Sequence, residues 1–272
     1  MEQHERAERF RGLHAASGAF VIPNPWDAGS ARILAALGFE ALATSSGAAA
    51  AVRGRRDGML SRDEALAQAR AIADSVDIPV AGDLEHGFGD RPEDAAETIR
   101  LAAASGLVGG SIEDGPADKR APVYELRLAV ARVEAAVAAA RALDFPFVFT
   151  ARAENFLRGS RDLRDTIERL QAYEKAGADV LFAPGLPNLE AVRTICRAVS
   201  RPVNFMAGIR GASFSIAELE DAGVKRISVA TSLYRAAATA LIEAATEIKT
   251  KGTFTYVDRA VTTPDLTPYL SR

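Results

Sequence analysis

The stretch Pro79–Gly89, PVAGDLEHGFG, is an apolar, strand-like run that ends in two carboxylates backed by glycines. The same arrangement returns in Ser111–Gly115, SIEDG. Acidic side chains at the ends of buried strands are poor core residues, but they suit a hard divalent cation, which takes oxygen ligands and keeps several waters. The stretch therefore predicts a buried strand with magnesium chemistry at its end.

Seven other segments share the β-branched and aromatic composition of this strand. In chain order the eight segments are Phe20–Pro23, Ala41–Ser45, Pro79–Asp83, Val108–Glu113, Pro146–Arg152, Val180–Pro184, Val203–Ala207 and Arg226–Ala230. Helical patterns lie between them, and this alternation is typical of a parallel sheet with crossover helices. The chain has 272 residues, close to the usual size of a barrel of this kind, about 250. The sequence therefore predicts one α/β domain over residues 1–272, a TIM-type (β/α)8 barrel.

Glycines that end helices distinguish the two faces of this barrel. Gly38, Gly106, Gly177 and Gly223 each come just before a predicted strand, where glycine supplies the left-handed residue of a helix-to-strand loop. The carboxylates follow the strands and therefore lie on the opposite face. In barrels of this type that C-terminal face carries the functional site.

Helix signals support this order of elements. Ser61–Glu64 is a capping box that opens a helix over Glu64–Ser75. After the last strand, Leu233–Thr250 has the pattern of a long helix, and Thr253–Arg272 is a tail too polar for the core. We expect the C-terminal helix and tail, residues 231–272, to pack on a neighbouring subunit or on the outside of the barrel.

Composition excludes several classes of function. A formal net charge of −3 and scattered Lys and Arg residues give no basic field for nucleic acid. The single Cys196 has no partner for a disulfide and no Cys or His neighbours at metal-ligand spacing. Met1–Phe10 is charged rather than apolar, and no run approaches the roughly 20 apolar residues of a membrane span. We expect a cytoplasmic protein that binds neither nucleic acid nor membranes.

Three carboxylates are candidate metal ligands on spacing alone. Asp83 and Glu85 are two residues apart and share one face of a regular strand, and Glu113 ends the next strand. Neighbouring parallel strands bring such groups within reach of one cation. Without a cation they would repel one another and shift each other's pKa. The structural alternative is pairing with Arg152 or with helix N-termini.

Other polar residues follow further strands. Arg152 offers a planar fork for a substrate carboxylate or phosphonate, or for a salt bridge to Glu113 or Glu154. The turn Thr44–Ala48 presents hydroxyls and backbone N–H groups that suit an anion. His86 is the only one of three histidines among the carboxylates. It is a candidate general acid or base, or a solvent-facing neighbour of the site.

An ordered set of motifs resembles the isocitrate lyase/phosphoenolpyruvate mutase superfamily. The set, which extends over nearly the whole chain, comprises Asn24–Ala28, Ser46-Gly47, Asp57, Asp83–Gly89, Ile112–Asp114 and Ala151-Arg152. The resemblance implies a (β/α)8 barrel in a homo-oligomer, a dimer or a tetramer of swapped dimers, in which a C-terminal helix packs on the partner subunit. It also implies enolate chemistry on 2-oxo acids, or on 2-hydroxy acids cleaved to them.

The resemblance also implies roles for single residues, by position. The implied ligands of Mg²⁺, or of Mn²⁺ in its place, are Asp83, Asp57, Glu85 and Glu113. The implied substrate-binding residues are Ser46, Gly47, Ala48 and Arg152, and Asn204 at the end of the seventh strand is a further candidate. The candidate catalytic residues are Arg152, His86 and Asp57.

Two departures from the family pattern narrow the expected function. DLEHGFG stands where Asp-x-Asp-Thr-Gly-Tyr-Gly is usual, which keeps an acidic pair. Pro116–Val123, PADKRAPV, stands where isocitrate and methylisocitrate lyases carry Lys-Lys-Cys-Gly-His. It offers neither Cys nor His to protonate the departing enolate, and the Asn that phosphonate enzymes use in this region has no clear counterpart.

We therefore expect a Mg²⁺-dependent carbon–carbon lyase that acts on a small 2-oxo or 2-hydroxy di-acid such as oxaloacetate. Retro-aldol cleavage or β-decarboxylation would proceed through an enolate, with His86, Tyr124 or water supplying the proton. The alternative within enzymes is phosphonopyruvate hydrolase or phosphoenolpyruvate mutase activity. The alternative from another class is a non-catalytic protein that binds oxo acids.

Overall fold

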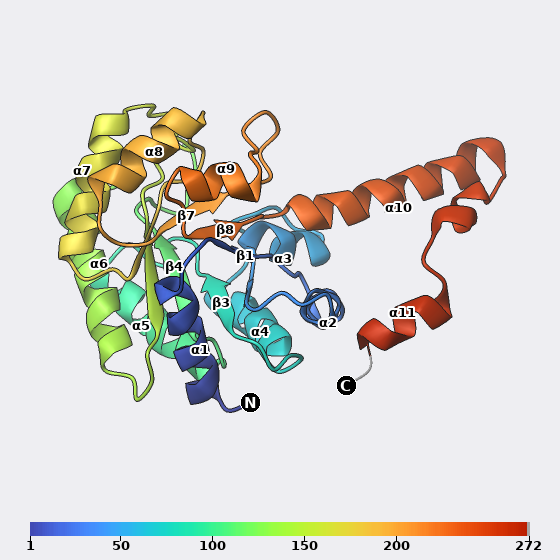
Figure 1. The fold of residues 1–272 in the computed structure, drawn as a ribbon, viewed down its shortest axis with the longest axis horizontal. Coiled ribbons are helices and arrows are strands. Elements are labelled where there is room, and N and C mark those ends of the chain that lie inside the picture. The colour runs from blue at the N-terminus through green and yellow to red at the C-terminus, as the bar shows by residue number, and fades with distance from the viewer. Residues whose placement is uncertain (271–272) are drawn as a thin grey trace.

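Eight parallel strands form the centre of the molecule in the computed structural model, which describes residues 1–270 (Figure 1). In chain order the strands are β1 (Phe20–Ile22), β2 (Leu42–Ala43), β3 (Val80–Asp83), β4 (Gly109–Glu113), β5 (Val148–Arg152), β6 (Val180–Phe182), β7 (Val203–Met206) and β8 (Arg226–Ser228). Each strand lies within one of the eight predicted segments. Helices alternate with the strands, so the predicted (β/α)8 barrel is confirmed.

Within the described chain the sheet runs β1-β8-β7-β6-β5-β4-β3-β2 and has a seam between β1 and β2. Single hydrogen bonds cross this seam in place of a strand ladder. The Ala43 N–H donates to the Pro23 carbonyl at 3.1 Å. The Asn24 side chain donates to the Thr44 carbonyl and accepts from the Val229 N–H, both at 2.9 Å. Asn24 therefore ties the ends of β1, β2 and β8 together.

The helices form an outer layer around the sheet. Their bounds are α1 (Gln3–Ala15), α2 (Ala28–Ala36), α3 (Ser46–Val52), α4 (Arg62–Ala73), α5 (Pro92–Ala104), α6 (Leu126–Arg141), α7 (Leu163–Lys175), α8 (Leu189–Ala198), α9 (Ile216–Asp221), α10 (Ser232–Lys251) and α11 (Thr263–Leu270), with a 3-10 turn over Thr255–Arg259. Fully buried side chains such as Ile99, Phe149 and Leu170 belong to the main apolar cluster. This cluster contains residues of both helices and strands and is the main core.

Local sequence signals located the ends of α4 and α10 to within two residues. Ser61 caps α4 by accepting the Glu64 N–H at 3.3 Å, as the capping box predicts, but the helix begins at Arg62 and ends at Ala73, each two residues earlier than expected. The four glycines predicted to be left-handed, Gly38, Gly106, Gly177 and Gly223, have φ angles between 86° and 98°. These loops therefore lie on the face opposite the carboxylates, as expected.

The sequence did not predict helix α1. Its composition is polar, and it contributes only Ala7 and Phe10 to a second apolar cluster, where they join Val108 and Val148 of the barrel interior. Gly109 leaves room for Phe10, because a Cβ there would lie 2.7 Å from the ring. Burial of the Phe10 side chain contributes roughly 1.5–3 kcal/mol. Helix α1 thereby packs across the N-terminal end of the barrel.

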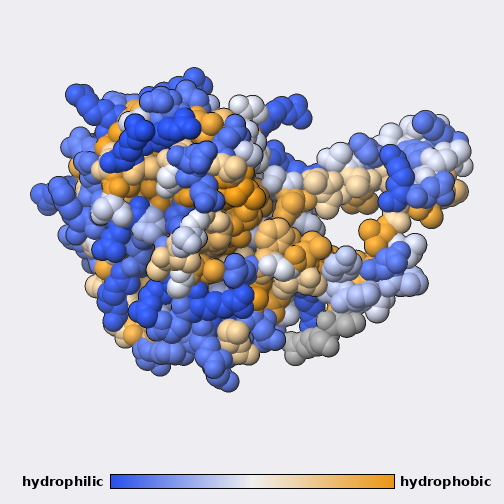
Figure 2. Space-filling model, in the orientation of Figure 1, coloured by the Kyte–Doolittle hydropathy of each residue, from blue (hydrophilic) through white to orange (hydrophobic). Residues whose placement is uncertain are grey.

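The C-terminal helix α10 projects away from the barrel, and the chain returns to place α11 beside α2 (Figure 1). Every residue of α10 is exposed or half-buried, and Leu241 and Ile242 are 71% and 64% exposed. Figure 2 shows apolar residues along this arm and on the barrel face next to it. The Arg32 side chain donates to the Leu270 carbonyl at 3.0 Å. The arm, residues 232–270, lies outside the barrel as expected, and its packing on a partner stays a prediction.

Within residues 1–270, no helix combines the length and the apolar character that membrane crossing requires.

Candidate active site

A cavity of about 410 Å³ lies at the carboxyl ends of the strands and reaches into the barrel. The predicted site residues that line it are Ser46, Gly47, Asp57, Asp83, Glu113, Arg152 and Asn204. Ala48, Glu85 and His86 lie outside this lining. The structure therefore brings together most of the predicted site at the C-terminal face.

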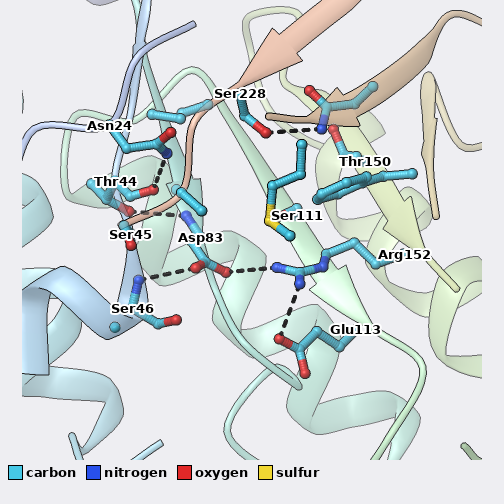
Figure 3. A pocket seen from close by; sticks show the side chains of 18 of the residues that line it. Asn24, Thr44, Ser45, Ser46, Asp83, Ser111, Glu113, Thr150, Arg152 and Ser228 are labelled. Carbon is cyan, nitrogen blue, oxygen red and sulfur yellow. Dashed lines mark hydrogen bonds and ion pairs between the residues drawn. The ribbon is translucent and has the colours of Figure 1, made fainter. Parts of the chain in front are cut away.

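Arg152 is the central cation of the cavity (Figure 3). Its guanidinium contacts Asp83 Oδ1 at 3.1 Å, Glu113 Oε1 at 3.4 Å and Glu154 Oε1 at 2.8 Å. Burial disfavours its charge, but the carboxylates of Glu154, Glu113 and Asp83 outweigh burial and raise the pKa of Arg152. The Phe182 ring packs 4.9 Å below the guanidinium. These contacts hold the fork in one orientation, and they are the salt bridges that the sequence offered as the structural alternative.

The segment expected to be a turn of small residues is the start of helix α3. Ser45 caps this helix by accepting the Ala48 N–H at 3.3 Å. The Ser46 N–H donates to Asp83 Oδ2 at 2.9 Å, and the Asp83 N–H donates to Thr44 Oγ1 at 2.9 Å. Serine and alanine are compatible with a helix N-terminus as well as with a turn, which explains the wrong expectation. The helix start therefore contacts the key carboxylate directly.

Asp57 and Glu85 are carboxyl groups of this region whose pKa is raised. Burial and the charge of Asp83 raise the pKa of Asp57. Burial, Asp83 and Asp57 together raise the pKa of Glu85 to about 8. Glu85 also has a left-handed backbone with φ of 49°, and its carbonyl accepts the Glu113 N–H at 2.8 Å. The charge of Asp83 contributes to the raised pKa of Asp57 and of Glu85, as repulsion between carboxylates predicts, whereas neighbouring cations lower the pKa of Glu113.

The placement, donor atoms and charge of these carboxylates bear on whether they fit a divalent cation. Within residues 1–270, no three His, Cys, Asp or Glu side chains stand as a ready-made set of metal ligands. Oxygens of Asp83 and Glu113 contact Arg152 and Lys119 instead. The donor chemistry fits nonetheless, because all the predicted ligands offer hard oxygens. The raised pKa of Asp57 and Glu85, caused first by burial and then by neighbouring carboxylates, shows that their ionised forms are disfavoured, and a bound cation would favour those forms. The metal site stays a prediction.

The loop Pro116–Val123 contributes a cation that sequence reasoning missed. Lys119 Nζ contacts Glu113 Oε1 at 2.9 Å and Oε2 at 2.7 Å, and it lines the cavity. Burial lowers the pKa of Lys119, but the Glu113 carboxylate outweighs burial, so the pKa is raised overall. The charged tripeptide Asp118–Arg120 at the middle of this loop carried the signal, but a charged loop residue does not by itself reveal whether it faces the cavity or solvent.

Arg158 fastens the same loop. Its guanidinium donates to the carbonyls of Pro116 at 2.7 Å and of Asp118 and Ala121 at 3.0 Å, and it lies 3.5 Å from Glu113 Oε2. The Arg158 side chain is only 2% exposed. The loop is therefore held against the cavity by one buried arginine.

Two of the three expected proton donors lie away from the cavity. His86 packs beside Phe88, and within the described chain its buried Nδ1 has no hydrogen-bond partner. Burial lowers the pKa of His86. The Tyr124 hydroxyl donates to Asp90 at 2.5 Å, and burial and this bond raise the pKa of Tyr124. The acid–base role of His86 stays a prediction without a contact to the cavity.

The inner part of the cavity is polar. Asn204 donates to the Ser228 hydroxyl at 3.1 Å and accepts from Arg226 Nε at 2.8 Å. Arg226 also donates to Thr150 Oγ1 at 3.0 Å. Sequence reasoning left Asn204 as a candidate and did not single out Arg226, because an arginine at the start of a strand usually points to solvent at the end of a barrel. Here it is buried and lines the cavity.

Comparison with known proteins shows what the chain is similar to. Residues 10–249 match the family model described as phosphoenolpyruvate phosphomutase. A crystal structure from Burkholderia cenocepacia J2315, described provisionally as a lyase/mutase, is 50% identical with a TM-score of 0.97, and the match covers 99% of this chain and 98% of that one.

Two enzymes with named substrates are also similar. The 2,3-dimethylmalate lyase of Eubacterium barkeri is 28% identical over 255 residues, which cover 91% of this chain and 87% of the relative. The structure of oxaloacetate acetylhydrolase with its product oxalate is 25% identical, with a TM-score of 0.90 and coverage of 99% of this chain and 95% of that one. The similarity therefore extends over nearly the whole chain.

Proposed function

Because the chain belongs to the phosphoenolpyruvate phosphomutase family, in the isocitrate lyase/phosphoenolpyruvate mutase superfamily, we propose that it is a Mg²⁺-dependent carbon–carbon lyase. The substrate is a small 2-oxo or 2-hydroxy di-acid such as oxaloacetate, and the reaction is retro-aldol cleavage or β-decarboxylation through an enolate. One observation carries the proposal. The cavity sets the Arg152 fork beside the start of α3 and the carboxylates of Asp83 and Glu113.

The similar enzymes support this class of substrate. Both 2,3-dimethylmalate and oxaloacetate, which give these relatives their names, are di-acids with a four-carbon chain and an oxygen at carbon 2. The proposed substrate belongs to the same class. A cytoplasmic location belongs to the same proposal.

Different residues of the chain would bind the metal ion, bind the substrate carboxylate and orient the substrate in the proposed reaction. Asp83, Asp57, Glu85 and Glu113 would hold Mg²⁺, which when bound acts as a Lewis acid and stabilises developing negative charge on oxygen. Ser46 and Gly47, which line the cavity at the start of α3, would bind the substrate carboxylate, with the Ser46 N–H shared with Asp83 Oδ2. Ala48, the third residue that the resemblance implies, lies outside the lining, and its N–H already donates to Ser45 Oγ. Arg152 would orient the same unit, because its fork is already fixed by Glu154.

The proton for the departing enolate has two candidate sources at the cavity. His86 and Tyr124 lie outside the lining. Lys119 lines the cavity and carries a raised pKa, so it is protonated at neutral pH and can donate. Water is the other source. The absence of Cys and His from Pro116–Val123 argues against cleavage of isocitrate or methylisocitrate.

A second candidate is phosphorus–carbon chemistry on phosphonopyruvate, as a hydrolase or mutase. The description of the matching family model favours it. The Arg152 fork suits a phosphonate as well as a carboxylate. A protein that binds oxo acids without turnover is the remaining possibility from another class.

We also propose that the protein is a homo-oligomer, a dimer or tetramer, in which α10 packs on a partner subunit. The exposed apolar side chains of Leu241 and Ile242 support this assembly, because large exposed apolar surfaces usually mark interaction sites.

Proton and phosphorus NMR of the purified protein with Mg²⁺ tests the function. The panel is oxaloacetate, phosphonopyruvate, dimethylmalate and methylisocitrate. We expect pyruvate or another enolate-derived acid from oxaloacetate or dimethylmalate above the metal-only rate, and loss of this turnover with EDTA or in Asp83→Ala. Phosphate or phosphoenolpyruvate from phosphonopyruvate would favour the second candidate. Tight binding without product would favour the binding protein.

A further inference from the structure

Four cationic side chains of the described residues line the cavity: Lys119, Arg152, Arg158 and Arg226. Arg226 differs from the other three in its partners. Arg152 contacts Asp83, Glu113 and Glu154, and Lys119 and Arg158 both contact Glu113. In the same part of the chain, residues 1–270, no carboxylate lies within 4.0 Å of the Arg226 guanidinium. The Arg226 charge is therefore uncompensated by any acidic side chain.

The surroundings of Arg226 are polar but neutral. Its three hydrogen-bond partners are Asn204 Oδ1 at 2.8 Å, Thr150 Oγ1 at 3.0 Å and His14 Nε2 at 3.4 Å. The residue is 6% exposed, and burial lowers the pKa of Arg226 to about 9. A buried charge without an opposite charge is costly, so this position favours an anion that arrives from the cavity.

The geometry of β5 relates Arg226 to the predicted substrate site. Thr150 and Arg152 are two residues apart on this strand, both line the cavity, and Thr150 accepts from Arg226. Two residues advance a strand by about 6.6 Å. Figure 3 shows Thr150 and Ser228 on one side of the Asp83–Arg152 pair, with Glu113 and Ser46 on the other. The cavity thus contains two arginines at different depths along β5, one at Arg152 and one, Arg226, beside Thr150.

We propose that Arg226, with Thr150 and Ser228, forms a subsite for the second carboxylate of a di-acid, while Arg152 and the start of α3 hold the first. This rests on the proposed function and makes Arg226 the residue that selects di-acids over mono-acids. Lys119 and Arg158 are weaker candidates for that task, because both already contact the Glu113 carboxylate. Arg226 retains two guanidinium hydrogens beyond those donated to its three partners, so it can still bind a carboxylate.

Binding measured without turnover tests the subsite. Malate and 2-hydroxybutyrate have the same four-carbon chain and differ at the far end, a carboxylate against a methyl group. Isothermal titration calorimetry with Mg²⁺ would compare them on the wild type, Arg226→Met and Arg226→Lys, with NMR confirming that neither ligand is consumed. We expect the wild type to bind malate about 10- to 100-fold more tightly, as for a charge-assisted hydrogen bond. Arg226→Met should lose this preference and keep its affinity for 2-hydroxybutyrate, and Arg226→Lys should retain part of it.

Two outcomes would overturn the subsite. One is a malate preference that survives in Arg226→Met. The other is an equal loss of both ligands, which would mean that Arg226 acts only by positioning Asn204. Asn204→Asp keeps the test open if Arg226→Met fails to fold, because it places a carboxylate against Arg226 with little change of shape. It should remove the malate preference.

The test also separates the subsite from the proposed reaction. A malate preference that depends on Arg226, in a protein that turns over no substrate of the panel, would uphold the subsite and reject the lyase. Turnover of oxaloacetate with no role for Arg226 in binding would uphold the lyase and reject the subsite.

Discussion

At the scale of single residues, Glu113 controls the charge of the cavity. Burial raises its pKa, but Arg152, Lys119 and Arg158 outweigh burial and lower it, so Glu113 stays ionised. Lys119 in turn lies at the centre of a loop whose family counterparts carry the acid that this chain lacks. Lys119, paired with the Glu113 carboxylate, is therefore one of the two proposed proton sources, and water is the other.

Substitution of Lys119 tests this dependence. We expect Lys119→Met to lower kcat roughly 100-fold or more, as for loss of a general acid, with a smaller change in KM. The neighbouring Arg120 provides a matched control, because its side chain is 91% exposed and pairs with Asp118. Arg120→Met should leave kcat within about 2-fold, since exposed pairs contribute little. Steady-state kinetics on the substrate found by NMR would decide, and equal losses in the two variants would count against Lys119.

His14 gives a prediction about pH and stability. Arg226 can only donate, so His14 Nε2 accepts, and Nδ1 carries the hydrogen that is donated to the Phe10 carbonyl at 2.8 Å. Burial, followed by the charge of Arg226, lowers the pKa of His14 to about 3. Between the unfolded value of 6.5 and about 3, the unfolded chain binds a proton that the folded chain does not. Stability should therefore fall as pH drops below 6.5, by up to about 1.4 kcal/mol per pH unit.

Urea unfolding of the wild type and of His14→Gln measures this contribution. The wild type should lose more stability than the variant between about pH 7.5 and about pH 5, because the variant lacks the titrating ring. Parallel losses in the two proteins would show that His14 does not contribute.

The sequence predicts those site residues whose position follows from neighbouring residues in the chain. It does not predict those that depend on contacts distant in sequence. Asp83, Glu113 and Arg152 are the last residues of β3, β4 and β5, so their meeting at one face follows from the barrel alone. Arg226 and Lys119 were missed because the first begins a strand and the second lies in a loop, and neither position fixes a direction. The contacts of Arg226 with Thr150 and His14 join segments 76 and 212 residues away. Such contacts depend on the whole packing.

At the scale of elements, strands and helix-ending glycines are predictable because both obey local rules. The strands were marked by composition and the loops by the left-handed glycines. Helix α1 was missed because only Ala7 and Phe10 are buried along its length, which leaves little apolar periodicity to detect. Helix α3 was missed because its first residues suit a turn equally well.

The loop Pro116–Val123 gives a prediction at this scale. Arg158 donates to three of its carbonyls, so Arg158→Gln should free the loop and speed trypsin cleavage after Lys119 and Arg120 several-fold, because exposed and mobile loops are cleaved first. Arg161→Gln is the control, since Arg161 is exposed and nearby. Mass spectrometry of early fragments would measure the rate. An unchanged rate in Arg158→Gln would mean that other contacts fasten the loop.

At the scale of the whole molecule, the barrel accounts for residues up to the end of β8, and the arm stands apart. Its apolar side chains are exposed in the single chain, which is expected of a surface that a partner covers. Composition and a long helical pattern predicted the arm, but the sequence of one chain does not contain the contacts of a second.

Changing two residues of the arm tests the assembly. The double substitution Leu241→Glu and Ile242→Glu should dissociate the oligomer, because charges would enter an apolar interface. It should leave a monomer with the circular dichroism of the barrel. Glu243→Lys is the control, because Glu243 is exposed and lies about 150° around the same helix from the midpoint of Leu241 and Ile242. Light scattering coupled to size exclusion would measure mass, and a monomeric wild type would reject the assembly.

The seam between β1 and β2 affects where the barrel opens locally and exchanges its amide hydrogens. The Leu42 and Thr44 amides bond to β3, whereas the Ala43 amide bonds across the seam to Pro23. Deuterium should therefore replace the Ala43 hydrogen sooner than its neighbours' hydrogens, since one contact rather than a ladder protects it. The seam also adjoins the start of α3, where the substrate carboxylate is proposed to bind. A ligand that contacts both sides of this seam would slow the exchange of the Ala43 amide hydrogen. It would thereby stabilise the closed form of the barrel.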